Sequence, residues 1–179
     1  MPKVVLDIGC AKHGGDESIP YLVEEFEPDY LFGFDPALEQ TVNAYNLAGT
    51  TVVTQRAAAW LYDGGVRFLV AGLGGRVTET GDDFPCFDLA RMITSFPDDW
   101  NVILKMDAEG AEYVLIPHLH STGADKRLDL AVIEWHCFDC GIGGNGRHRE
   151  GCKGDPVAWE ERRSGLVQLM RCGMQEWNL

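Results

Sequence analysis

The chain has few basic residues for its size. Lysine and arginine together number 15 against 28 aspartates and glutamates, which gives a formal net charge of −13 over 179 residues. Sequence-independent binding to nucleic-acid phosphates requires a basic surface, and so does binding to an anionic membrane. The composition therefore predicts partners that are neither nucleic acid nor membrane.

Long apolar runs are also missing. The longest run, from Ala57 to Tyr62, has about six residues, whereas a helix that spans a bilayer needs roughly 20. The first ten residues, MPKVVLDIGC, contain one lysine and an apolar stretch interrupted by Asp7. They lack the length and the cleavage site of a secretory signal. We expect a cytoplasmic protein without a transmembrane helix.

Cysteine is too scarce to form a disulfide scaffold. Six cysteines are spread over the chain, and a core of this size needs no such scaffold, so we expect reduced thiols. Hydrophobic residues make up 45% of the chain and charged residues 24%, as is usual for one globular domain. The sequence predicts a single domain over residues 1–179, minimal in size and short at both termini.

Apolar strands alternate with helical stripes along the chain. Strands are predicted at residues 4–6, 30–34, 51–53, 102–106 and 128–135, and a hairpin or strand pair at 57–62 and 66–70 around a turn at 63–65. Apolar residues three or four positions apart predict helices around residues 19–26, 38–45, 89–96, 111–119 and 159–170. This alternation indicates an α/β fold with a mostly parallel central sheet and helices on both faces.

In such a sheet, ligands bind beyond the carboxyl ends of the strands, near the point where the strand order reverses. The residues directly after the strands, Asp7, Asp35, Asp107 and His136, are therefore the candidate site.

A glycine-containing turn follows the first strand; it holds Asp7, Gly9 and Cys10 and ends with Gly14 and Gly15. Asp35 comes about 20 residues after this turn, where a carboxylate can accept hydrogen bonds from both hydroxyls of a ribose. The turn and the acidic residue together indicate a nucleotide-like ligand. The alternative is that the glycines only turn the chain and that Asp35 caps the following helix.

The charge of the turn discriminates between nucleotide-like ligands. Asp7, Asp16 and Glu17 flank the turn, and their carboxylates would repel the pyrophosphate of a dinucleotide. S-adenosylmethionine carries a sulfonium and an ammonium and no phosphate, so an acidic loop favours it. The residues thus predict a methyl donor rather than NAD.

The sequence resembles the FkbM-like methyltransferases, a family within the class I S-adenosylmethionine-dependent superfamily. The resembling segments run through most of the chain in the family's order, and KMDAEGAEY is the most specific block: VVLDIGC (4–10), LFGFDP (31–36), AAAWLYDGGVRFLV (57–70), FDLARMI (87–93), VILKMDAEGAEYVLIPHL (102–119) and VIEWHC (132–137). The resemblance implies a Rossmann-like methyltransferase fold and O-methylation of a hydroxyl, commonly on a sugar or another small molecule.

By the same resemblance, Asp7 and Gly9 line the methionine end of the donor, Asp35 the ribose, and Ala57 and Ala58 the adenine side. Cys10, in the first turn, and Asp107, after the fourth parallel strand, are further donor-binding candidates.

Asp107, Glu109 and Glu112 lie where that strand meets a helix, and Asp107 and Glu109 are close enough in sequence to converge. They could hold the donor's ammonium, orient or deprotonate an acceptor hydroxyl, or bind a divalent ion, which is left open rather than predicted. Their alternative role is to stabilise a helix start. His136, together with Asp107 and Glu109, is a candidate catalytic residue, because an ordinary histidine can be neutral at physiological pH and act as a base. A histidine of the core is its alternative.

Cys137, Cys140, His148 and Cys152 are ligand types that zinc prefers, although their spacing matches no familiar finger. The same loop holds the pattern Gly141-x-Gly143-x-x-Gly146 without a helical stripe after it. An NAD-type enzyme and a non-catalytic Rossmann-like binding module are the alternatives to a methyltransferase. The acceptor substrate is not encoded by any motif, and a homo-oligomer is left open.

Overall fold

The computed structural model describes residues 1–10, 18–71, 74–77, 79, 81–136, 156–170 and 172–176. In chain order the elements are β1 (Lys3–Ile8), α1 (Ser18–Phe26), β2 (Tyr30–Phe34), β3 (Val42–Leu47), β4 (Thr50–Gln55), β5 (Ala58–Trp60), β6 (Gly64–Ala71), β7 (Gly74–Val77), β8 (Asp82–Asp88), α2 (Leu89–Ser95), β9 (Asn101–Met106), α3 (Glu112–Thr122), the 3₁₀ turn η1 (Ala124–Arg127), β10 (Leu130–Ile133), α4 (Pro156–Leu169) and β11 (Gly173–Glu176).

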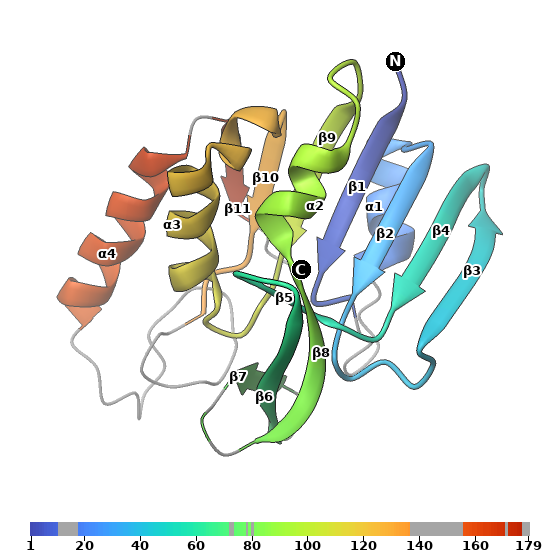
Figure 1. Ribbon diagram of the computed structural model, residues 1–179. Coiled ribbons are helices and arrows are strands. Elements are labelled where there is room, and N and C mark those ends of the chain that lie inside the picture. The colour runs from blue at the N-terminus through green and yellow to red at the C-terminus, as the bar shows by residue number, and fades with distance from the viewer. Residues whose placement is uncertain are drawn as a thin grey trace.

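Within the described residues, seven strands form the main sheet in the order β11-β10-β9-β1-β2-β4-β3. All neighbouring pairs are parallel except β3 with β4. The chain starts at β1 in the middle of the sheet, proceeds through β2 to one edge, and returns to build β9, β10 and β11 on the other side (Figure 1). The strand order therefore reverses between β1 and β9.

Side-chain alternation in the strands divides the core between the two faces of the sheet. Val4, Leu6 and Ile8 of β1 pack in a large cluster with residues of α2, α3 and α4. Val5 points to the other face, where it packs with Leu22 of α1. Because both faces of the central strands are covered, these strands are nearly continuous apolar runs, interrupted by Asp7 in β1 and Lys105 in β9. The fold is thus mixed α/β, with a mostly parallel sheet between α1 on one face and the other helices on the opposite face (Figure 1).

A smaller sheet is inserted between β4 and α2. Its order, among the described residues, is β5-β8-β6-β7, and it lies beyond the carboxyl ends of the main strands (Figure 1). The rings of Phe34, at the end of β2, and Phe87, in β8, lie 4.4 Å apart and join the two sheets. The strands predicted at 57–62 and 66–70 are confirmed as β5 and β6 with shifted ends. The prediction that they pair with each other is wrong. β8 lies between them and pairs with both β5 and β6.

The helix predicted around residues 38–45 is wrong, because this segment contains the strand β3. Leu38, Val42 and Tyr45 have helical spacing, but β3 instead forms a hairpin with β4. The turn has positive φ at Ala48 (50°) and Gly49 (97°), the backbone combination that suits tight hairpins. Pairing with β4 therefore outweighs a weak helical pattern.

The remaining predicted elements are confirmed with shifted ends. α1, α2, α3 and α4 fall on the other four predicted helices, and β1, β2, β4, β9 and β10 on the predicted strands. No helix in the described part of the chain combines the length and apolar character needed to cross a bilayer.

Candidate functional site

Gly9 forms the turn at the carboxyl end of β1 and ties three strands together. Its N–H donates to the carbonyl of Phe34 at 2.9 Å, while the N–H of Asp107 donates to the carbonyl of Ile8 at 2.9 Å. Gly9 has φ +83°, and a Cβ added to it would lie 1.9 Å from the carbonyl oxygen of Asp107. Only glycine fits here, so the ends of β1, β2 and β9 meet at the predicted turn.

Asp7 is fully buried and engaged by two partners. Ser18 Oγ donates to its Oδ2 at 2.6 Å, and Lys105 Nζ lies 3.1 Å from its Oδ1. Lys105 also donates to the carbonyl of Gly9 at 2.9 Å and lies 3.5 Å from Asp107 Oδ2. Burial alone would lower the pKa of Lys105, but the neighbouring carboxylates outweigh it and raise this pKa above its ordinary value. A charged lysine thus links the first turn to Asp107.

Cys10 and Asp35 lie on the same edge of the sheet, and both are buried. A Cβ added to Gly33 would lie 2.9 Å from Cys10 Sγ, so the thiol packs directly on β2. Burial, reinforced by Asp7 and Asp35, raises the pKa of Cys10 far above its usual range. The thiol is therefore uncharged and acts as a small apolar group.

The Asp35 carboxylate supports the turn after β2, since its Oδ1 accepts the N–H of Ala37 at 2.7 Å. The alternative in which Asp35 caps a helix is not found, because no helix follows it before β3. Ala57 and Ala58, expected on the adenine side, are both buried: Ala57 packs in the large cluster of the main sheet, and Ala58 packs in the cluster of the smaller sheet. Their side chains pack in the core.

Asp107, Glu109 and His136 converge. His136 Nε2 lies 3.3 Å from Asp107 Oδ1 and 3.9 Å from Glu109 Oε2, and one ligand atom from each of the three lies within 4.8 Å of the other two. Asp107 directly follows β9, and His136 follows β10, the adjacent parallel strand. The expected convergence of Asp107 and Glu109 is therefore present and extends to His136.

Glu112 holds the imidazole of His136 from the opposite side. Its Oε1 lies 2.9 Å from His136 Nδ1 and accepts the N–H of Ala108 at 2.8 Å. Burial lowers the pKa of His136, but Glu112, Asp107 and Glu109 outweigh burial and raise the pKa to about 9. The ring is therefore an imidazolium at neutral pH. A neutral imidazole was expected from an ordinary pKa, and the surrounding carboxylates are the reason for the difference.

Glu109 sits in a backbone conformation with φ +50°. Burial raises the pKa of its carboxyl; His136 opposes this shift, whereas Asp107 and Glu112 add to it. Glu134 also faces the cluster, with Oε1 4.0 Å from His136 Nε2. Four carboxylates thus surround one imidazole.

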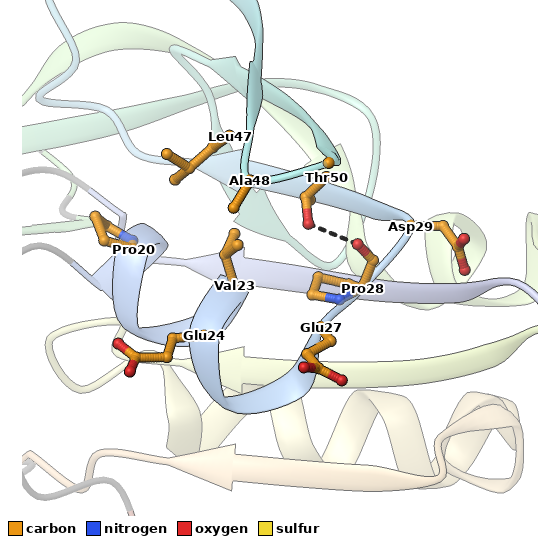
Figure 2. A pocket seen from close by; sticks show the side chains of 10 residues that line it. Pro20, Val23, Glu24, Glu27, Pro28, Asp29, Leu47, Ala48 and Thr50 are labelled. Carbon is orange, nitrogen blue, oxygen red and sulfur yellow. Dashed lines mark hydrogen bonds between the residues drawn. The ribbon is translucent and has the colours of Figure 1, made fainter.

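An open groove of about 640 Å³ lies elsewhere, between α1 and the β3–β4 turn. Figure 2 shows Leu47 and Ala48 facing Val23 across it, and Thr50 Oγ1 donating to the carbonyl of Pro28 at 2.7 Å. Thr50 begins β4, so this groove lies at the amino ends of the strands. It is separate from the site at the carboxyl ends.

Some predicted features lie outside the described residues: Asp16, Glu17, the cysteine–histidine set Cys137, Cys140, His148 and Cys152, and the glycine pattern at 141–146. Sequence reasoning missed Lys105 and did not assign Glu112 its contact with His136. A lysine inside the apolar strand VILKM was a usable signal, because a buried lysine almost always has charged partners.

No protein-family model, curated protein or solved structure matches the chain. The family resemblance therefore rests on the sequence motifs alone.

Proposed function

We propose that this protein transfers a methyl group from S-adenosylmethionine to a hydroxyl of a small molecule or sugar. The observation that carries the proposal is the meeting of Gly9, Asp35 and the Asp107–Glu109–His136 cluster at the carboxyl ends of β1, β2 and β9. The strand order reverses between β1 and β9, and ligands of open α/β sheets bind at such a switch point. A Rossmann-like methyltransferase fold is the finer assignment that we propose with it.

The charges of the side chains at this edge of the sheet fit S-adenosylmethionine better than a dinucleotide. The edge carries an excess of negative charge, because two cations, Lys105 and His136, face a larger number of carboxylates: Asp7, Asp35, Asp107, Glu109 and Glu112. Positive groups of the donor are attracted there, and a pyrophosphate is repelled. We assign Asp35 to the ribose and the backbone at Gly9 to the methionine end. Asp7, being fully buried, acts by holding the turn.

The donor supplies a methyl group on a positively charged sulfur. The acceptor's oxygen attacks the methyl carbon, the carbon–sulfur bond breaks with its electron pair moving to sulfur, and the hydroxyl proton leaves late. Alignment therefore matters more than early deprotonation. Because His136 is already protonated at neutral pH, Asp107 and Glu109 are the groups able to orient the hydroxyl and accept its proton.

Calorimetry tests the donor. We expect S-adenosylmethionine and its demethylated product to bind and NAD not to bind; the opposite preference would refute the proposal in favour of an NAD-type enzyme. Asp35→Ala should weaken donor binding about tenfold or more, the scale of a lost hydrogen bond to a charged group. Glu39→Ala, an exposed change in the same loop, should leave it unchanged.

Turnover separates an enzyme from a binding module. The protein and the donor, incubated with a metabolite extract, should add one CH₂ unit of mass to a metabolite. Donor binding without such a product in any extract would favour the non-catalytic module.

A further inference from the structure

Three side chains at the carboxyl ends of β9 and β10 bring atoms of metal-ligating types close together. Two carboxylates and one imidazole place their ligand atoms within 4.8 Å of one another. Ligand atoms about 2.1 Å from one octahedral ion lie about 3 Å apart. The observed separations of 3.3 Å and 3.9 Å from His136 Nε2 therefore need only small side-chain movements to close around an ion.

A second, independent observation comes from Glu112, whose side chain is fully buried behind His136. Its carboxylate can only accept, so His136 Nδ1 must be the donor of their 2.9 Å contact. This fixes the ring with Nε2 turned to Asp107 and Glu109. Proteins orient metal-binding histidines through a carboxylate on the other ring nitrogen in this way.

Two buried oxygens of the cluster make no hydrogen bond within the described part of the chain: Glu109 Oε2 and Glu112 Oε2. A buried carboxylate oxygen without a donor is costly, and Glu109 Oε2 is the atom that faces His136 Nε2. A cation between them would remove that cost for Glu109.

The two oxygens of Asp107 are divided between two neighbours. Oδ2 faces Lys105 Nζ at 3.5 Å, whereas Oδ1 faces His136 Nε2 at 3.3 Å. Lys105 thus leaves Oδ1 available, and it places no positive charge directly between the three ligand atoms.

We propose that Asp107, Glu109 and His136 bind one divalent transition-metal ion of the Mn²⁺ class, and that the ion takes the place of the proton on His136 Nε2, which is released to water. Carboxylate oxygens suit Mn²⁺ and Mg²⁺, whereas imidazole favours transition metals, so the mixed set points to Mn²⁺ over Mg²⁺. Three protein ligands leave coordination positions for water and for an acceptor oxygen. Resting on the proposed function, the ion's role is to hold the acceptor hydroxyl and lower its pKa. With the ion bound, Asp107 and Glu109 serve as ligands, and the hydroxyl, made more acidic by the ion, gives its proton to a water molecule.

The test uses the full chain, stripped with EDTA and titrated with Mn²⁺ in the absence of any methyl donor. Electron paramagnetic resonance of free Mn²⁺ should report about one bound ion per chain, and Mn²⁺ should raise the melting temperature. Glu109→Gln and His136→Gln should each weaken Mn²⁺ binding by roughly tenfold or more. The side chain of Glu109 is partly exposed, whereas that of His136 is buried. The matched variants His118→Gln and Asp83→Asn, which alter a histidine and a carboxylate elsewhere, should bind as the wild type does.

The outcomes for the ion and the methyl donor are distinguishable. Absence of Mn²⁺ binding, or binding that survives both Glu109→Gln and His136→Gln in folded protein, would overturn the metal site and leave the methyl donor untouched. Mn²⁺ binding that requires these side chains, in a protein that does not bind S-adenosylmethionine, would support the metal site while the proposed methyltransferase function fails.

Discussion

Replacing Lys105 by methionine tests whether this buried cation holds the first turn in place. Methionine is similar in length and apolar, so the change removes the ammonium with little loss of packing. It leaves Asp7, which is 0% exposed, without the cation that lies 3.1 Å from it. It also removes the hydrogen bond to the carbonyl of Gly9.

Breaking a buried ion pair by removing one partner costs about 3–5 kcal/mol, because the other charge stays buried and uncompensated. For a chain of this size, each kcal/mol shifts the melting temperature by about 2–4 °C. Lys105→Met should therefore lower the melting temperature by roughly 6–20 °C. Such a loss is a large part of the free energy of unfolding of an ordinary domain, about 5–15 kcal/mol.

Urea unfolding followed by circular dichroism measures the effect, with the double variant Asp7→Asn/Lys105→Met as the decisive comparison. Neutralising Asp7 as well removes the uncompensated charge, while an asparagine oxygen can still accept from Ser18. The double variant should be more stable than the sum of the single changes predicts. If Lys105→Met costs less than about 1 kcal/mol, or if the two changes simply add, the buried pair does not organise this turn.

His136 should make the free energy of unfolding depend on pH. The pKa of its ring is about 9 in the folded protein and about 6.5 in the unfolded chain. The stabilisation by the charged ring is therefore complete below pH 6.5 and is lost as the pH rises through 9. The loss should be about 3 kcal/mol in EDTA, seen in urea midpoints, and a wild-type profile as flat as that of His136→Gln would contradict it. Gly9→Ala should destabilise by at least roughly 1–3 kcal/mol, because alanine disfavours φ +83° and its Cβ would overlap the Asp107 carbonyl. A melting temperature lowered by less than about 2 °C, the shift expected for 1 kcal/mol, would show that the turn can rearrange. Leu104→Ala, at a fully buried position of β9, should cost about 2–5 kcal/mol in urea unfolding, and a smaller loss would mean that the core collapses around the cavity.

The central strands were predictable because both of their faces are buried. Strands such as VILKM of β9 need apolar residues at successive positions, and this leaves a pattern that a sequence shows directly. β8 was missed because its residues DDFPCFD are half exposed and include Pro85, a residue that disfavours strands. β3 was missed because it is an exposed edge strand that depends on pairing with β4, and no local pattern reveals that pairing.

The candidate site was predictable at its strand ends and less so around them. Asp107 and His136 follow β9 and β10, which are neighbouring parallel strands. The expectation that a site forms at the carboxyl ends of parallel strands was therefore enough to select both residues. The pKa of His136 could not be read from the sequence. It depends on Glu112, which is 24 residues away along the chain and reaches the ring from α3.

The pairing of β1 with β9 has a consequence for the order of folding. Lys3 of β1 lies opposite Asn101 of β9, so the strand made first must wait for a partner made about 100 residues later. At a synthesis rate of about 5–20 residues per second, that delay is roughly 5–20 s. During this time Asp7 cannot meet Lys105, and one side of β1 exposes its backbone groups. Contacts of such long range also slow folding of the complete chain. We therefore expect the nascent amino-terminal half, with β1 paired only to β2, to be the stage at which this protein most needs protection from aggregation.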